Sequence, residues 1–239
     1  MSPTGPGLVR AQHRPKVALV TDVPTAGAVQ QVFGPARVLG PAELGSSPEL
    51  ERARVELLTA LGGDEQIEAH RSYLLSFVLT HPDALQRSCA PGHLTSSALV
   101  VDAGLTRVLL LHHRKLGRWF QPGGHADGEA NLAVSALREA TEESGIAGLR
   151  VVGPAVDLDV HRVAPPAEEP HDHLDVRYLV LAPPAAVARH NHESTGQRWV
   201  RAEELEVFEP DAGLRRLVGR GLALAAYLRG GRQEGSGWP

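Results

Sequence analysis

Three glutamates near the middle of the sequence have the spacing of a metal site. Glu142 and Glu143 follow Glu139 by three and four residues, which places the side chains on one face of an α-helix. Such a face is unfavourable on its own, since each like-charge pair at this spacing costs roughly 0.2–0.5 kcal/mol. Carboxylates gathered against this repulsion indicate a hard divalent cation, Mg²⁺ above all, with phosphate oxygens of a bound ligand completing its shell.

Glycines before and after these acids mark the expected limits of the helix that positions them. Gly123 and Gly124 break a strand pattern and lead into the helix, and Gly145 is its expected C-cap. Glu142 and Glu143 then lie in the last turn, where the helix dipole opposes each acid by roughly 0.3–1 kcal/mol. Apolar, mostly small side chains would pack this helix on a sheet and leave the acidic face at the rim; they are Ala133, Ala136, Leu137 and Ala140.

A second polar cluster occupies a predicted strand. Strand alternation places His171, His173, Asp175 and Arg177 on one face. This face is either a wall that contacts phosphate near the metal or a polar surface open to solvent. An independent transition-metal site is disfavoured, because two histidines and one aspartate on one strand lack a fourth ligand. His125, inside the glycine loop, either meets a phosphate or braces the loop.

Composition excludes several classes of protein. The 239 residues are 42% hydrophobic, and no apolar run approaches the roughly 18 residues of a membrane span. No signal-peptide core is found near the N-terminus, and the single Cys89 is typical of a reducing cytoplasm. A net charge of −4 gives no electrostatic footprint for nucleic acid. We therefore expect a cytoplasmic protein that binds neither membranes nor nucleic acid.

The chain divides into four expected segments. Residues 1–47 are a poorly ordered or accessory extension, in which 16–21 could form a short strand, and 230–239 are a flexible tail. Residues 48–92 form a helical lead-in of two helices, the second capped by Asp64 and ending before Pro82. The remainder, 93–229, is an α+β domain. Its expected strands are 98–101 and 107–113, an antiparallel pair, and 149–161, 173–182 and 198–200; its expected helices, besides the acidic one, cover 202–206 and 211–228.

The segment from Gly124 to Ile146 resembles the signature of the Nudix hydrolases. That signature runs Gly, five residues, Glu, seven residues, Arg-Glu, an aliphatic residue, any residue, Glu-Glu, any residue, Gly and an aliphatic residue. The positions in register are Gly124, Arg138, Glu139, Ala140, Glu142, Glu143, Gly145 and Ile146. One position departs, because Ala130 stands where the first glutamate is expected and Glu129 lies one residue early. In the family that glutamate usually braces the arginine, so Asp127 or Glu129 would have to supply the brace.

The resemblance, which is to bacterial members of no particular subfamily, implies both a fold and a reaction. The fold is an α/β/α sandwich with a mixed sheet across about 93–209, with the lead-in helices and a C-terminal helix added. The reaction is the attack of water on phosphorus in a nucleoside diphosphate linked to another moiety, with Mg²⁺, or Mn²⁺ in its place, as the cofactor.

The resemblance also assigns roles to individual residues. Glu142, Glu143 and the carbonyl of Gly124 would be metal ligands, with Glu139 a further ligand or the base that deprotonates water. Arg138 would hold the loop and the carboxylates in place. Glu193, six residues before Trp199, matches a further family acid in a loop before the last core strand. His125, His173, Asp175 and Arg177 are the candidates for contact with the substrate.

Two alternatives share the scaffold. An isomerase of the isopentenyl-diphosphate type needs a cysteine near the glycine loop, and none is present there. A ligand-sensing or binding module without turnover, in which residues 1–92 contact a partner, is opposed by the intact trio of acids, while Ala130 leaves it open. The partner is expected to be a small nucleotide-type diphosphate, with a homodimer left open. No motif selects among ADP-ribose, dinucleoside polyphosphates, coenzyme A and oxidised nucleotides.

Overall fold

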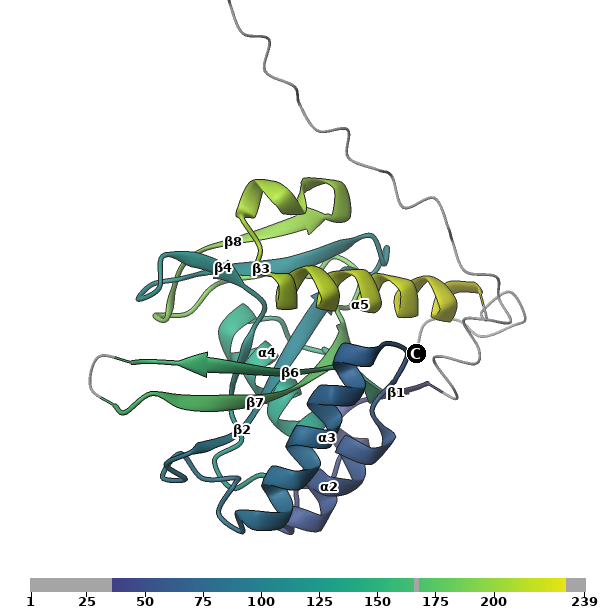
Figure 1. Cartoon of the computed structure of the whole chain (residues 1–239). Coiled ribbons are helices and arrows are strands. Elements are labelled where there is room, and N and C mark those ends of the chain that lie inside the picture. The colour runs from purple at the N-terminus through teal and green to yellow at the C-terminus, as the bar shows by residue number, and fades with distance from the viewer. Residues whose placement is uncertain (1–35, 166–167, 231–239) are drawn as a thin grey trace, which may run out of the picture.

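The computed structural model describes residues 36–165 and 168–230, which form one mixed sheet with helices on both faces (Figure 1). Its strands are β1 (Arg37–Leu39), β2 (Gly92–Val101), β3 (Arg107–His113), β4 (Arg118–Phe120), β5 (Gly123–His125), β6 (Arg150–Val163), β7 (His171–Leu181) and β8 (Ser194–Arg201). Its helices are α2 (Leu50–Thr59), α3 (Glu65–Thr80), α4 (Leu132–Ser144) and α5 (Ala212–Gly230), with the 3-10 helices η1 (Pro41–Glu43) and η2 (Ala202–Phe208).

The order of the strands explains how the glycine loop reaches the sheet. The path runs β1-β6-β7-β2-β3-β4, with β5 paired to β2 and β8 paired to β3. β2 and β7 are parallel, and the other pairs are antiparallel. β2 meets β3 at a single registered pair, Val101 with Val108. Nearer its start β2 pairs with β5, where Gly124 lies opposite Ser96, so the glycine loop is itself a short strand.

Alternating side chains give the sheet an apolar core on each face. Leu94, Ala98 and Leu174 belong to the core that α2, α3 and α4 cover. Leu99 and Leu179, their neighbours along the same strands, belong to the core under α5. The mixed sheet predicted from the sequence and the α/β/α sandwich that the family resemblance implies are both confirmed.

The two lead-in helices pack into the core that α4 also uses. Asp64 caps α3 as predicted, because its Oδ1 accepts a hydrogen bond from the N–H of Ile67 at 2.9 Å. Nδ1 of His70 on α3 bonds the carbonyl oxygen of Leu158 on β6 at 2.8 Å. Buried apolar residues of both helices, such as Leu57, are continuous with the residues under α4. The lead-in is therefore built into the sandwich.

Residues 36–47 were expected within the N-terminal extension and make defined contacts. β1 pairs with β6, placing Val38 opposite Val152. Residues 1–35, with the expected alternative of a strand at 16–21, and the tail from 231 lie outside the described residues.

Helix α4 ends at the glycine that the sequence predicts as its C-cap. Its C-cap Gly145 has φ 64°, the left-handed conformation that glycine adopts without strain, and its N–H bonds the carbonyl of Thr141 at 2.9 Å. The side chains expected to pack it on the sheet are all buried; they are Ala133, Ala136, Leu137 and Ala140. On the other face α5 comes so close that a Cβ on Gly221 would collide with Leu99.

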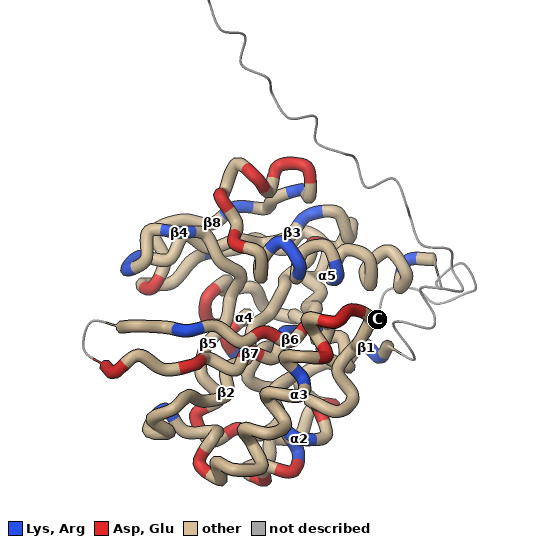
Figure 2. The backbone as a smooth tube through the Cα atoms, in the orientation of Figure 1, with Lys and Arg blue, Asp and Glu red and all other residues tan. Residues whose placement is uncertain are grey.

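Within the described residues, no helix combines the length and the apolar character needed to cross a membrane. Acidic and basic positions are interspersed along the described chain (Figure 2).

Candidate active site

Helix α4 presents Glu139 and Glu143 toward the glycine loop. The N–H of Gly123 donates to Oε2 of Glu143 at 3.0 Å. A Cβ on Gly124 would lie 2.5 Å from Cδ of Glu139, so only glycine fits while this carboxylate lies against the loop. The loop and the helix thus bring the backbone of Gly124 and two of the predicted metal-binding acids together.

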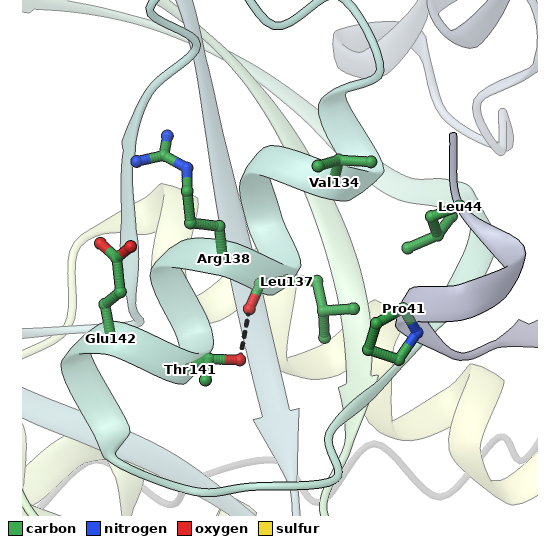
Figure 3. Close-up of a pocket in the computed structure, with 7 residues that line it drawn as sticks. All are labelled: Pro41, Leu44, Val134, Leu137, Arg138, Thr141 and Glu142. Atoms are coloured by element: carbon green, nitrogen blue, oxygen red, sulfur yellow. Dashed lines mark hydrogen bonds between the residues drawn. The ribbon is translucent and has the colours of Figure 1, made fainter. Parts of the chain in front are cut away.

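Arg138 joins the helix to the same loop. Its Nη2 donates to the carbonyl oxygen of His125 at 3.0 Å and lies 3.0 Å from Oε1 of Glu139. Glu142 is exposed, one turn further along, on the side of α4 that carries Arg138 (Figure 3). Through these two contacts Arg138 can hold both the glycine loop and the carboxylate of Glu139 in place.

Glu193 reaches the acids of α4 from the loop that precedes β8. Arg114 fastens that loop: its N–H donates to the carbonyl of Glu193 at 2.8 Å, and its Nε donates to the carbonyl of His192 at 2.8 Å. Burial raises the pKa of Glu139 and of Glu143, and the negative charge of Glu193 raises both further. Two segments far apart in the sequence therefore contribute carboxylates to one place.

The electrostatics of this place fit a divalent cation. Burial is the main cause that raises the pKa of Glu143 to about 7, and the neighbouring carboxylates act in the same direction. Arg138 favours the ionised form of Glu139 but is outweighed by burial. Anionic oxygens held together while partly removed from water are the donors that Mg²⁺ and Mn²⁺ prefer. Glu139, Glu143 and the carbonyl of Gly124 therefore fit such an ion, with Glu142 at the exposed side.

Asp127 and Glu129, the two residues expected to brace Arg138, instead bond other groups. Both oxygens of Asp127 pair with Arg87 at 2.6 Å. Glu129 accepts from the N–H groups of Ser47 at 2.8 Å and Asn131 at 2.7 Å. Among the hydrogen bonds and ion pairs of the described residues, neither carboxylate is joined to Arg138.

Glu56 of α2, which the sequence did not single out, caps the start of α4. Its Oε2 accepts from the N–H of Leu132 at 2.9 Å and from the hydroxyl of Tyr178. Its Oε1 accepts from Nε of Arg52 at 2.8 Å. Burial raises the pKa of this carboxyl, while the N-terminus of α4 favours an anion there. No pattern in the sequence marks Glu56, because its burial depends on α2 docking against α4.

The polar face of β7 is covered, and its predicted substrate-binding residues divide into two groups. Asp175 and Arg177 are 2% and 4% exposed, so the interpretation as a solvent-facing surface is wrong for them. Nε of Arg177 donates to Asp175 at 2.7 Å and its Nη2 donates to Asp159 at 2.8 Å. Nη2 of Arg216, from α5, also donates to Asp159, at 2.7 Å. A phosphate would have to displace carboxylates from Arg177, so this pair belongs to an ion network that ties α5 to the sheet.

His125 and His173 instead lie in a group of five imidazole rings. Neighbouring ring centroids are 4.8–5.4 Å apart, and the members are His93, His125, His161, His171 and His173. Burial lowers the pKa of His173 to about 3 and that of His125 to about 4, and it also lowers the pKa of His93. These three rings are therefore neutral at pH 7. His93 was missed because its neighbour His173 lies on another strand.

The family model of the NUDIX domain matches residues 92–218, more than half of the chain. Similar solved structures include an Ap4A hydrolase from C. elegans in a binary complex, at 20% identity over 57% of this chain and 98% of that chain, with a TM-score of 0.46. A NUDIX-family hydrolase from Clostridium perfringens is 20% identical over 57% of this chain and 97% of its own, with a TM-score of 0.44. RenU, a Nudix hydrolase from M. smegmatis, is 23% identical over 56% of this chain and 87% of its own, with a TM-score of 0.43. No curated protein matches the chain. With its family match spanning strands β2 to β8, the glycine loop and the acidic helix, the chain belongs to the Nudix family.

Proposed function

We propose that this protein is a Mg²⁺-dependent hydrolase that cleaves a pyrophosphate bond in a nucleoside diphosphate linked to another moiety. Membership of the Nudix family supports hydrolysis of pyrophosphate-type substrates in general. The observation that carries the proposal is the meeting of Glu139 and Glu143 with the backbone of Gly124, reinforced by Glu193 from a separate loop.

Each residue of the site has a part in this reaction. Glu139, Glu142, Glu143 and the carbonyl of Gly124 would hold Mg²⁺, or Mn²⁺ in its place. The ion would neutralise the pyrophosphate and lower the pKa of the attacking water. Arg138 keeps Glu139 and the loop in position through its contacts with both.

Two carboxylates are candidates for the general base. Glu139 is largely buried beside Arg138, whereas about half of the Glu193 side chain is exposed, at 53%. Either would take up the proton that water loses as it attacks phosphorus.

A pocket next to the Glu193 loop would receive the part of the substrate beyond the diphosphate. Its volume is about 470 Å³, and it is lined by His112, Trp119, His190, Thr195, Gly196, Gln197 and Arg198. The rings of His112 and Trp119 are 5.1 Å apart, and such rings offer a flat face on which a base can stack. This pocket is where we expect specificity to be decided.

The test is a panel of nucleoside triphosphates, nucleotide sugars, dinucleotides and coenzyme A incubated with Mg²⁺, with products resolved into monophosphate, phosphate and pyrophosphate. We expect turnover of at least one compound, and a loss of roughly 100-fold or more in Glu142→Gln, because a catalytic metal contributes several kcal/mol to the transition state. Glu203→Gln, at an exposed glutamate of η2, is the matched control. Wild-type turnover in Glu142→Gln would make the ligand assignment wrong. Binding of a panel compound without turnover would favour the sensing module.

A further inference from the structure

Three histidines of the imidazole group already have the spacing of metal ligands. One ring nitrogen from each of His93, His171 and His173 lies within 4.8 Å of the others. Two of these side chains are buried, and His173 is partly buried. The group lies on the face of the sheet opposite α4, because His93 alternates with the α4-facing Leu94.

The register of the strands builds this group from segments far apart in the sequence. β2 and β7 place His93 opposite His173, and His171 precedes it by two residues on the same face. β5 places His125 opposite Thr95, two residues along β2 from His93. The ring centroid of His125 is 4.9 Å from that of His93 and 5.2 Å from that of His173. His125 therefore stands beside the three close histidines as a candidate for the fourth ligand that one strand alone could not provide.

His93 is the observation that calls for a ligand. His93 is only 2% exposed. Neither of its ring nitrogens has a hydrogen-bond partner among the described residues. The carbonyl of Cys89 lies near enough to favour the protonated ring, but without the geometry of a hydrogen bond. Buried polar groups are nearly always satisfied, so a ring with both nitrogens unsatisfied at the centre of a histidine group indicates an absent binding partner.

The orientation of His171 suits a metal. Its Nδ1 lies 2.8 Å from the carbonyl oxygen of Glu169. Since a carbonyl only accepts, Nδ1 carries a proton, and Nε2 is the nitrogen whose lone pair a metal would use. A backbone carbonyl that fixes the tautomer in this way is the usual outer support of a metal-binding histidine.

We propose that His93, His171, His173 and His125 bind one transition-metal ion of the Zn²⁺ class at a site separate from the carboxylates of α4. Imidazole nitrogen suits Zn²⁺, Co²⁺, Ni²⁺ and Cu²⁺, whereas Mg²⁺ requires oxygen. Ligand bonds of about 2.0–2.1 Å draw the four nitrogens closer together around the ion than they now stand. This proposal does not depend on the hydrolase function.

The test uses Co²⁺ alone as a probe, because its visible absorption reports nitrogen coordination and geometry without any assay of activity. The full-length protein, stripped of metal on a chelating resin, is titrated with Co²⁺. We expect the wild type to bind one equivalent with the absorption of a low-coordinate, nitrogen-ligated ion. His173→Ala and His93→Phe should bind at least about tenfold more weakly, and circular dichroism should show that both are folded. His93→Phe fills the space of the buried ring.

Two controls separate this site from the rest of the molecule. His190→Ala removes an exposed histidine outside the group, and Glu142→Gln removes a carboxylate of the proposed Mg²⁺ site; both should retain the Co²⁺ spectrum. Unchanged affinity in both His93→Phe and His173→Ala would overturn the proposal, as would loss of the spectrum in Glu142→Gln alone. Binding of inorganic phosphate that His173→Ala abolishes, with no Co²⁺ spectrum in the wild type, would show an anion site and would also overturn it.

Discussion

At the scale of single residues, the candidate site places negative charges at the end of α4, where they lower the stability of the folded protein. Glu139, Glu142 and Glu143 lie in the last two turns of α4, and Arg138 is the cation that contacts one of them. A helix under selection for folding alone would carry basic residues at this end. The metal ion that we propose for this site would explain why the acids are kept there.

Removing one of these charges should stabilise the metal-free protein. Glu142→Gln is expected to raise the free energy of unfolding by roughly 0.3–1 kcal/mol in the presence of a chelator, because it relieves repulsion and an unfavourable dipole contact. Urea denaturation followed by circular dichroism measures this. Added Mg²⁺ should stabilise the wild type more than the variant. A variant less stable than the wild type under chelation would show that Glu142 contributes to folding.

Placing the family's glutamate at position 130 should lower the stability of this protein. Ala130 is fully buried and its N–H bonds the carbonyl of Ser47 at 2.6 Å. Ala130→Glu would bury a carboxylate in the apolar core to which Ala130 belongs, and we expect a loss of roughly 2–4 kcal/mol in stability. Ala147→Glu, at an exposed alanine just after α4, is the control. Wild-type stability of Ala130→Glu, with the new side chain paired to Arg138, would show that the loop accepts the family arrangement.

At the scale of elements, the helices could be predicted from their regular apolar spacing, whereas the shortest strands could not be predicted. α2, α3, α4 and α5 lie close to the predicted ranges because their apolar spacing, caps and glycines are local signals. β4 and β5 have three residues each, and β5 contains the two glycines that mark a break in the sequence. Their pairing with β3 and β2 depends on the sheet already being formed, which no local pattern encodes.

The contact between α2 and α4 should be worth a measurable part of the stability. Glu56→Ala would leave the N–H of Leu132 and the hydroxyl of Tyr178 buried without an acceptor, and we expect a loss of roughly 2–4 kcal/mol, since each such group costs about 1–3 kcal/mol. Glu51→Ala, an exposed position on the same helix whose partner is Arg54, should change stability little. Chemical denaturation of both variants makes the comparison. Equal stabilities would show that water replaces the carboxylate without loss.

At the scale of the whole molecule, the ion network fixes α5 to the sheet. Asp159 lies on β6, Arg177 on β7 and Arg216 on α5, so three elements meet in one group of charges. Burial alone would raise the pKa of Asp159, but hydrogen bonds from His161 and Arg216 and the charge of Arg177 hold it well below its usual range. The stability that this carboxylate adds is therefore present above pH 4 or so and is lost as the pH falls further.

Asp159→Asn should reveal this contribution. At pH 7 we expect the variant to be less stable by roughly 1–3 kcal/mol, because charge-assisted hydrogen bonds are weakened. The difference should shrink as the pH is lowered from about 5 to 2, where the wild-type carboxylate becomes protonated. Thermal unfolding across this range measures it. A difference independent of pH would show that packing, rather than charge, explains the effect.

The site itself was predictable only where its residues are neighbours in the sequence. Glu139, Glu142 and Glu143 follow from helical spacing. Glu193 came from resemblance to a family pattern, since nothing in its own loop marks it. His93 was recognised only from the register of β2 with β7. The role of Arg177 changed because its partners include Asp159 on β6 and the carbonyl of Gly213 on α5.

Glu56 accepts a hydrogen bond from Leu132 in the first turn of α4, and Ser47 accepts one from Ala130 just before that turn. Both residues precede residue 92, where the family match begins. A gene fragment trimmed to 92–218 would keep Glu139, Glu142, Glu143 and Glu193, yet it would remove the groups that bond the N-terminus of α4 and the residue just before it. The smallest unit worth expressing in isolation therefore starts upstream of Ser47. A shorter fragment that failed to turn over substrate would say nothing about the chemistry of the intact protein.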